Sequence, residues 1–222
     1  MEIRILERDE LARVGEIDRT ERIEVLFEQN GTELVASRGV WNAPAWNLDG
    51  HGEHSVSAQH ETLLRNADAG GIALGVFSND RLVGIGVVVL HIRPAMAQLA
   101  YLHVSRRSRS AGIGRSLSLA LERIAHRAGD TEIVVSATPS ENTVRFYLGR
   151  GYQPMEQPLP ELLELEPEDI HMGKQIRRSN HRGSASLSGL LQLHDQTPAG
   201  LGQVVGFDGE PVVLRAGGGP DS

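Results

Sequence analysis

One stretch of the chain, from Ala97 through the helix that begins near Gly114, restricts the fold more than any other. Residues 97–104 (AQLAYLHV) form an apolar run typical of a strand, and the sequence then changes abruptly to SRRSRSAGIGRSL. The following stretch predicts a helix that ends at Gly129. One face of this helix is apolar and consists of Ile113, Leu117, Leu121 and Ile124. The order strand, polar loop, helix favours a mixed α/β protein.

The loop between this strand and helix has the chemistry of an anion site. In the pattern Arg109-x-x-Gly112-x-Gly114, glycines let the backbone approach a ligand, and the first amides of a helix are free to donate. Arg106, Arg107, Arg109 and Arg115 add positive charge in a chain of net charge -7. A ligand with a pyrophosphate fits, although tight strand-to-helix packing beside solvated arginines remains an alternative.

A dinucleotide-binding Rossmann site competes for the same pattern. That fingerprint needs its glycines directly after the strand and an acidic residue at the end of the next strand. Here several polar and basic residues intervene, and the next strand, residues 131–137 (TEIVVSA), ends without an acid. The pattern therefore disfavours a Rossmann site.

The elements before the loop follow from local signals. We expect a strand over residues 2–6, then an amphipathic helix from Asp9 with Leu11, Val14 and Ile17 at helical spacing. Asn30-Gly31 predicts a tight hairpin with positive φ at both residues. Residues 40–54 are expected to form a loop, and Ser55 to cap a helix that runs to about Asp68.

The remaining elements complete a sheet. Apolar runs at 71–77 and 82–92 predict an antiparallel hairpin, and a last strand is expected near 169–176. Between them, Ser140 is expected to cap a short helix through Leu148, which Gly151 ends.

The segment NTVRFYLGRGY, Asn142–Tyr152, lies about thirty residues after the glycine pair. With VSRRSRSAGIGRSL, it resembles the two common motifs of the GNAT superfamily of acetyltransferases, in the family's order and spacing. The resemblance covers residues 2–176 in outline and is specific from about 97 to 152. It implies an α/β (α+β) fold: a mixed, mostly antiparallel sheet, flanked by helices, whose splayed middle strands admit the pantetheine arm of acetyl-CoA.

The resemblance also implies site residues. Backbone groups of Leu102, His103 and Val104 would flank pantetheine and the thioester, and Asn142 resembles the asparagine that binds the cofactor arm, although it could instead satisfy helix-end amides. Tyr147 would protonate the departing thiolate as a general acid, or it packs with Phe146 in the core. The pyrophosphate would be held by the loop Arg109, Ser110, Ala111, Gly112, Ile113, Gly114 and Arg115.

The general base is the least determined residue. Many family members use an acid near the strand before the loop, but this chain has none between Asp80 and Glu122. His103, on the same strand face as Tyr101, is one candidate for a base or a water-positioning group, and a structural role is its alternative. Glu53, with His54 and Glu61, is a second candidate, and a solvated loop is its alternative.

The histidines His51, His54 and His60 with Glu53 invite a metal interpretation. Zinc sites need three or four convergent ligands at a recognised spacing, which this pattern lacks. We therefore predict no metal site.

Composition excludes several classes. The acidic charge and pI near 5.7 disfavour nucleic-acid binding. The absence of cysteine excludes disulfides and an acyl-cysteine intermediate. The N-terminus MEIRILERDE lacks the apolar core of a signal peptide, and no run approaches the roughly 20 apolar residues of a membrane span. We expect a cytoplasmic protein with no membrane partner.

These observations predict a GNAT domain over residues 1–176 and a partly flexible extension over 177–222 with a short hairpin near Gly206–Gly209. The predicted activity is direct transfer of an acetyl group from acetyl-CoA to an amine of a small molecule or protein. Trp41 and Trp46 would supply apolar surface to the acceptor wall. One alternative is a non-catalytic CoA-binding regulatory or structural module. Another is that the extension contributes a strand to a neighbouring subunit in a homodimer.

Overall fold

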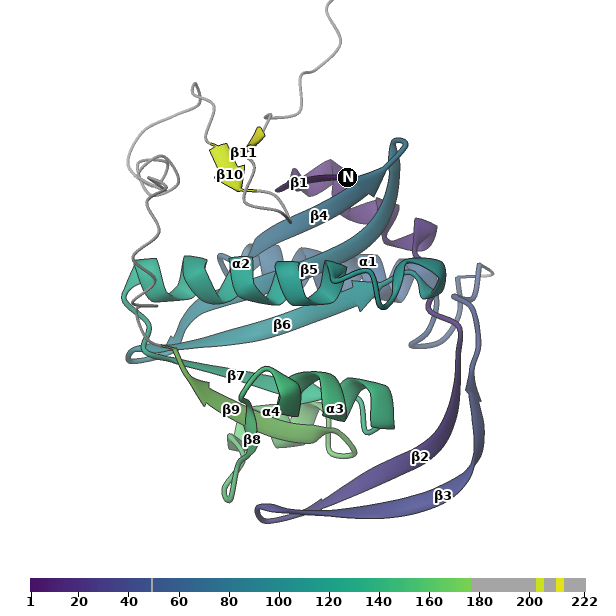
Figure 1. Ribbon diagram of the computed structural model, residues 1–222, viewed down its shortest axis with the longest axis vertical. Helices are drawn as coiled ribbons and strands as arrows, with labels where there is room; N and C mark the ends of the chain where they lie inside the picture. Colours follow the sequence, from purple (N-terminus) through teal and green to yellow (C-terminus); the bar gives the residue numbers. More distant parts are fainter. Residues whose placement is uncertain (49, 177–202, 206–210, 214–222) are drawn as a thin grey trace, which may run out of the picture.

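The computed structural model describes residues 1–48, 50–176, 203–205 and 211–213. Its main feature is a seven-stranded sheet in the order β1-β4-β5-β6-β7-β9-β8 (Figure 1). The strands of this sheet are β1 (Glu2–Ile5), β4 (Ile72–Ser78), β5 (Arg81–Arg93), β6 (Met96–Val104), β7 (Glu132–Ala137), β8 (Gln153–Pro154) and β9 (Ile170–Gln175). Only β6 and β7 pair in parallel among the described strands. The predicted mixed, mostly antiparallel α/β fold is confirmed.

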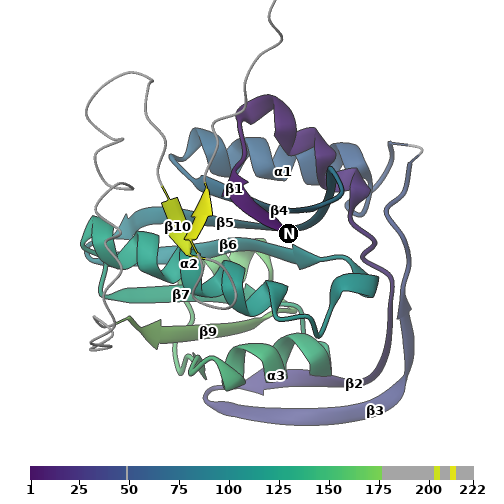
Figure 2. The same cartoon turned by 45° about the horizontal axis from the view of Figure 1, so that its top comes forward.

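Helices cover both faces of this sheet. The helical segments are η1 (Arg8–Glu16), α1 (Val56–Asp68), η2 (Arg106–Ser108), α2 (Ile113–Ala128), α3 (Glu141–Gly149) and α4 (Pro160–Leu165). Figures 1 and 2 show α2 on one face and α1 with η1 on the other. Leu117 and Leu121 of α2 pack in one core cluster, whereas Leu63 of α1 and Leu11 of η1 pack in a second.

The amphipathic helix expected from Asp9 is present as the 3₁₀ helix η1, which begins one residue earlier, at Arg8. Leu11, Val14 and Ile17 are all buried. Their interval of three residues matches the three residues per turn of a 3₁₀ helix, which places all three on one face. The apolar positions were correct, but a three-residue interval fits both helix types.

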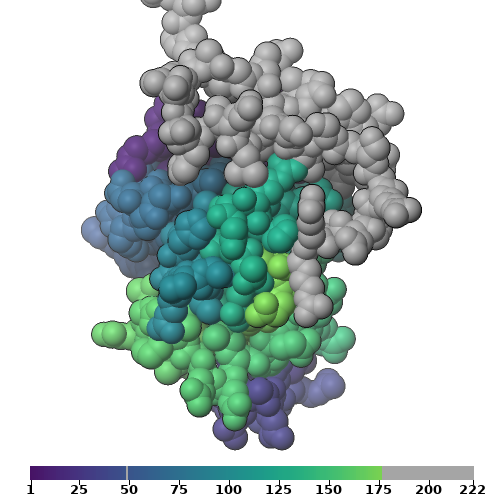
Figure 3. Space-filling model, turned by 90° about the vertical axis from the view of Figure 1, so that its left-hand side faces the viewer, coloured from purple at the N-terminus to yellow at the C-terminus, as the bar shows by residue number. Residues whose placement is uncertain are grey.

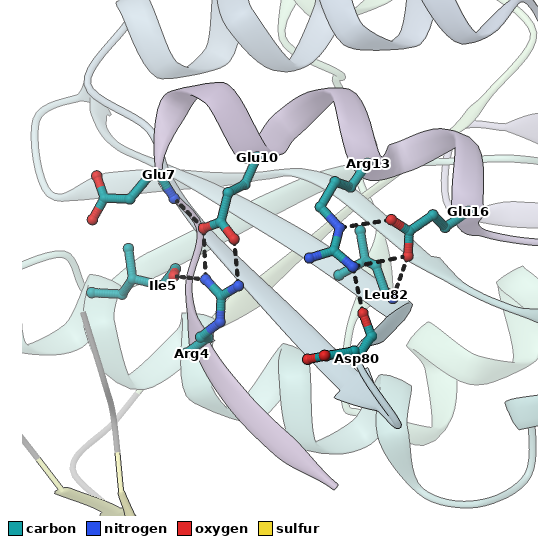
Figure 4. A network of polar contacts seen from close by, with 8 residues as sticks. All are labelled: Arg4, Ile5, Glu7, Glu10, Arg13, Glu16, Asp80 and Leu82. Carbon is teal, nitrogen blue, oxygen red and sulfur yellow. Dashed lines mark hydrogen bonds and ion pairs between the residues drawn. The ribbon is translucent and has the colours of Figure 1, made fainter. Parts of the chain in front are cut away.

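Side-chain contacts fix η1 to the sheet (Figure 4). Glu10 forms an ion pair with Arg4 of β1, which lowers the pKa of the Glu10 carboxyl. Glu16 accepts from the backbone N–H of Leu82 at 2.7 Å, and Arg13 bonds both Glu16 and the carbonyl of Asp80. These contacts join η1 to β1 and to the β4–β5 turn.

A second, separate sheet consists of β2 (Glu21–Asn30) and β3 (Glu33–Ala43), an antiparallel hairpin. The prediction of a tight hairpin here is confirmed, but its turn residues were wrong by one position. Asn30 pairs with Glu33, so Gly31 and Thr32 form the turn, and only Gly31 has a positive φ, of 61°. The strand also continues to Ala43, so the loop expected from residue 40 begins later.

The predicted helix ends agree with the structure. Ser55 accepts a hydrogen bond from the Ala58 N–H at the start of α1, and Ser140 accepts one from the Thr143 N–H at the start of α3. Gly112 and Gly129 flank α2 with φ values of 79° and 103°. The sequence did not predict β8, α4 or η2.

The middle of the large sheet splays apart. β6 pairs with β7 only through Met96–Gln98 opposite Glu132–Val134, although β6 continues to Val104 and β7 to Ala137. Beyond this point β6 stays paired with β5, and β7 with β9. A register shift leaves Ala100 as an extra residue in β6, and such bulges increase strand twist. The expected gap between two middle strands is confirmed.

In the space-filling view of Figure 3, teal atoms of the α2 region adjoin green atoms of the β8 and β9 region, and the violet tip of the β2–β3 hairpin projects below them.

No helix among the described residues is long and apolar enough to cross a membrane. β10 (Gln203–Val205) and β11 (Pro211–Val213) pair antiparallel, and the rest of the predicted extension lies outside the described residues.

Candidate functional site

The loop from Ser105 to Gly112 follows the end of β6, at the unpaired end of the gap between β6 and β7. Ser110 and Gly112 both have left-handed backbone conformations, with φ values of 65° and 79°. The first backbone hydrogen bond of α2 runs from the Ser116 N–H to the Gly112 carbonyl at 3.0 Å. The amides of Ile113, Gly114 and Arg115 therefore precede the helical ladder and can donate to a ligand.

Close packing places this loop beside α3. A Cβ atom added to Gly114 would lie 3.4 Å from the Phe146 ring and 3.7 Å from Val104. On β5, Gly84 and Gly86 leave room for α2, because a Cβ there would approach Ile113 or Leu121 within 3.0 Å. The glycines thus bring the start of α2, the end of β6 and α3 together.

The four arginines of the loop do not act alike. Arg106, Arg107 and Arg115 are exposed and can face an anion. Arg109 is half-buried, and its guanidinium bonds Glu21 at 2.7 Å, the Val104 carbonyl at 3.2 Å and the Arg19 carbonyl at 3.3 Å. Arg109 therefore anchors the loop to the start of β2.

Glu21 bridges the two sides of the gap. Its carboxylate accepts from Arg109, which follows β6, and from the Asn142 amide of α3, which follows β7, at 2.9 Å. Neither sequence interpretation of Asn142 included this contact. A hollow of about 190 Å³ lies next to the bridge and is lined by Glu21, Arg22, Ile23, Glu24, Glu141 and Asn142.

Tyr147 lies in the core cluster beneath α2 and α3. It is 4% exposed, and its ring packs against Phe146 at 5.0 Å and Tyr152 at 5.2 Å between centroids. Burial raises the pKa of the Tyr147 phenol, and the charges of Asp169 and Glu122 raise it further. Within the described part of the chain, its hydroxyl has no hydrogen-bond partner. The phenol is therefore protonated and free to donate.

His103 lies near the open end of β6. Its ring centroid is 4.8 Å from that of Tyr101, which confirms the predicted shared face, and 5.4 Å from that of Trp46. Tyr101 in turn donates to Gln59 of α1 at 2.7 Å. Burial, together with the positive charges of Arg19 and Arg109, lowers the pKa of His103 to about 4. The imidazole is therefore neutral at physiological pH.

Arg19 completes this group, and we call Arg19, Trp46, Tyr101 and His103 the aromatic–arginine cluster. The Arg19 guanidinium carbon lies 4.7 Å from the Trp46 ring centroid. No pattern in the sequence singled out Arg19. The two tryptophans were also not separated by any pattern, but Trp41 packs over Gly39 of its own strand and is 36% exposed.

The second predicted base group stays on the surface. The Glu53 side chain is 87% exposed and lies 3.4 Å from His54. Glu61, His51 and His54 are also exposed. In the described ranges no three His, Cys, Asp or Glu side chains are placed to hold a metal ion.

Asp169 is a further candidate that the sequence did not indicate. It directly precedes Ile170, which pairs with Ala137 at the open end of β7. Burial, together with the neighbouring charge of Glu166, raises the pKa of the Asp169 carboxyl to about 7. A carboxyl group that titrates near neutrality can accept a proton in catalysis.

Comparisons with known proteins agree with this geometry. Residues 53–161 match the family model described as an acetyltransferase (GNAT) domain. A comparison with curated proteins finds no match. Among solved structures, the chain is similar to nourseothricin acetyltransferase, with 13% identity, a TM-score of 0.60, and coverage of 79% of this chain and 98% of that one.

Two further structures have the same fold. A Bacillus anthracis protein assigned as a streptothricin acetyltransferase, in complex with acetyl coenzyme A, has 15% identity to this chain and a TM-score of 0.56. The match covers 77% of this chain and 94% of that one. The ribosomal-protein-S18-alanine N-acetyltransferase from Escherichia coli has 15% identity and a TM-score of 0.51. The match covers 82% of this chain and 98% of that one. Identities this low support a shared fold.

Proposed function

Because this chain belongs to the GNAT superfamily of acetyltransferases, we propose that it transfers the acetyl group of acetyl-CoA to an amine of a small molecule or protein. The observation that carries the proposal is the gap between β6 and β7, with the free amides at the start of α2 beside its open end. Backbone groups of Leu102, His103 and Val104 border this gap and can pair with an extended ligand.

In the proposed binding mode, the diphosphate of acetyl-CoA lies against the loop. The amides of Ile113, Gly114 and Arg115 donate to it, and the nearby exposed arginines supply positive charge. Ser110 and Ala111 shape the loop, and Arg109 anchors it. We assign Asn142 to the entry of the gap, where it is bonded to Glu21.

The proposed reaction is a direct attack. The amine nitrogen forms a bond to the thioester carbonyl carbon, and the carbon–sulfur bond then breaks. Tyr147 gives its proton to the departing thiolate, and a base takes the proton that the amine loses. The raised pKa of Tyr147 keeps the phenol protonated until that step.

A substitution in the loop tests the binding mode. Gly112→Ala places a methyl group on a left-handed residue, which costs about 1–2 kcal/mol or shifts the loop. Gly129→Ala is the matched control, because it introduces the same strain at the other end of α2. We expect calorimetry to show at least about tenfold weaker acetyl-CoA binding only for Gly112→Ala. Equal binding by the two variants would contradict the proposed loop.

The pH dependence distinguishes the proposed bases. A base must be unprotonated, so kcat/KM, expressed per free amine, rises as pH increases through the pKa of that base. We expect a midpoint near 7, from Asp169, because His103 with a pKa of about 4 is a weak base. Asp169→Asn should remove this limb, whereas His103→Gln should keep it. A wild-type rate that stays flat down to about pH 5 would exclude Asp169 and favour His103.

The activity itself is tested by following free thiol release from acetyl-CoA over a panel of small amines and peptides. Amine-dependent release supports acetyl transfer. Binding of acetyl-CoA without release for any amine would favour a CoA-binding module without catalysis. We further propose that residues 1–176 form the catalytic domain, since the Ile176 N–H bonds the Thr131 carbonyl at 2.8 Å and closes the sheet.

A further inference from the structure

We propose that the acceptor amine carries an anionic group, a carboxylate or a phosphate-type oxyanion, which Arg19 and the indole N–H of Trp46 bind. This inference rests on the proposed function, and it adds the chemical class of the acceptor. It follows from unpaired donors in the aromatic–arginine cluster and from the position of that cluster at the gap.

The cluster lies on the opposite side of β6 from the cofactor helix. Tyr101 packs in the core cluster beneath η1 and α1, whereas Leu102 and Val104 pack with the cluster beneath α2. The His103 ring lies beside that of Tyr101 on the η1 and α1 side. The backbone of the same residues borders the unpaired part of the gap. An acceptor at the cluster would thus approach a thioester in the gap from the face opposite α2.

Two donors in this cluster are buried without partners. Arg19 Nη1 and Trp46 Nε1 each lack a hydrogen-bond partner among the residues that the structure describes. Trp46 is only 7% exposed. Buried donors without acceptors are uncommon and cost stability, so each needs an explanation. Both belong to the same stack, in which the guanidinium lies over the indole ring.

The charge of Arg19 is also unpaired, unlike that of its neighbours. Arg13, Arg22 and Arg109 each have a carboxylate partner, on Glu16, Glu24 and Glu21 respectively. In the described ranges no carboxylate oxygen forms an ion pair with Arg19, and the exposed Glu53 acts on it only at longer range. Burial accordingly lowers the pKa of Arg19. A ligand oxyanion would supply the missing charge.

The position of Arg19 is fixed relative to the cofactor loop. Its carbonyl accepts a hydrogen bond from the Arg109 side chain. The adjacent Asp18 also bonds the loop: its carbonyl accepts from the Arg106 N–H at 2.8 Å, and its N–H donates to Ser105 Oγ at 3.1 Å. A guanidinium presents several donors in one plane and suits the paired oxygens of carboxylate or phosphate. The geometry therefore favours an acceptor that has an anion at one end and its amine near His103.

Matched pairs of acceptors test this proposal with the full chain. One set compares free L-amino acids with the corresponding amino-acid amides, which keep the amine and side chain but lose the negative charge. A second set compares aminoalkylphosphonates with amino alcohols of the same length. We expect the wild-type enzyme to prefer the anionic member of at least one set by about 10- to 100-fold in kcat/KM. The set that shows this preference identifies the oxyanion.

Variants assign the preference to Arg19. Arg19→Gln should abolish it by raising KM for the anionic acceptor, with little change for the neutral one, and Arg19→Lys should restore part of it. Arg22→Gln is the control, because Arg22 is exposed, lies three residues away and pairs with Glu24. Thermal unfolding of each variant shows whether a loss comes from misfolding, and an equal kcat/KM for the neutral acceptor is the second check.

The outcomes separate this inference from the activity on which it rests. Acetyl transfer to neutral amines at least as fast as to their anionic partners would overturn the inference and leave the acetyltransferase intact. An Arg19→Gln variant that loses the same factor on both members of a pair would overturn it too. No thiol release with any amine would remove both proposals.

Discussion

Replacement of Tyr147 by phenylalanine is expected to lower kcat at least about 100-fold, because a general acid contributes typically 10²- to 10⁴-fold. The substitution removes only the hydroxyl, which has no protein partner in the described residues, and keeps the ring that packs against Phe146 and Tyr152. Stability should therefore change little, and acetyl-CoA affinity should stay within about threefold. Steady-state kinetics together with calorimetry measure the two effects.

Tyr152→Phe is the matched control for this experiment. Tyr152 is also buried, lies next to Tyr147, and donates its hydroxyl to Glu122 at 3.3 Å. Its loss should lower the free energy of unfolding by about 1 kcal/mol and leave kcat largely unchanged. If Tyr147→Phe retained the wild-type kcat, the thiolate would receive its proton from another group and the assignment of Tyr147 would be wrong.

Glu122→Leu is expected to give the largest loss of stability, about 3–5 kcal/mol, because it leaves buried partners uncompensated. The Glu122 side chain is 7% exposed and accepts from Lys174 of β9 at 2.7 Å and from Ser118 Oγ at 3.0 Å. Arg150 and Tyr152 lie within 3.5 Å of the same carboxylate. Urea unfolding followed by circular dichroism measures the effect.

A double substitution identifies the cause of that loss. Glu122→Leu combined with Lys174→Met removes the strongest unpaired partner, so it should recover part of the stability. Glu141→Gln provides a surface comparison, since Glu141 pairs with the exposed Arg145 and such pairs contribute at most about 1 kcal/mol. A Glu122→Leu variant as stable as Glu141→Gln would show that the Glu122 contacts hold little free energy.

Most of the fold could be predicted because its signals are local. Ser55 and Ser140 cap the helices that their positions predict, and Gly129 ends α2 in a left-handed conformation. The strand boundaries follow apolar runs. The error at the hairpin has a local cause as well, because Asn30-Gly31 does not fix which pair of residues occupies the turn.

The candidate site was harder to predict because its contacts join distant segments. The loop glycines and Tyr147 were found through motifs, whereas the Glu21 bridge depends on how β2 crosses the gap. Arg19 looks like any other arginine in the sequence, and what distinguishes it is a buried guanidinium nitrogen that has no hydrogen-bond partner among the described residues. Asp169 likewise gains interest only from burial.

The β2–β3 hairpin is a self-contained insertion between η1 and α1, since it forms a sheet of its own. It docks on the main body through the packing of Phe27 and Leu34 against the core, the Phe27 N–H to the Pro139 carbonyl at 2.9 Å and the Gln29 amide to the Met155 carbonyl at 2.7 Å. Residues can be added or removed in pairs at its tip without shifting the register of any strand in the large sheet. The length of this arm can therefore change while the strands that border the gap keep their pairing.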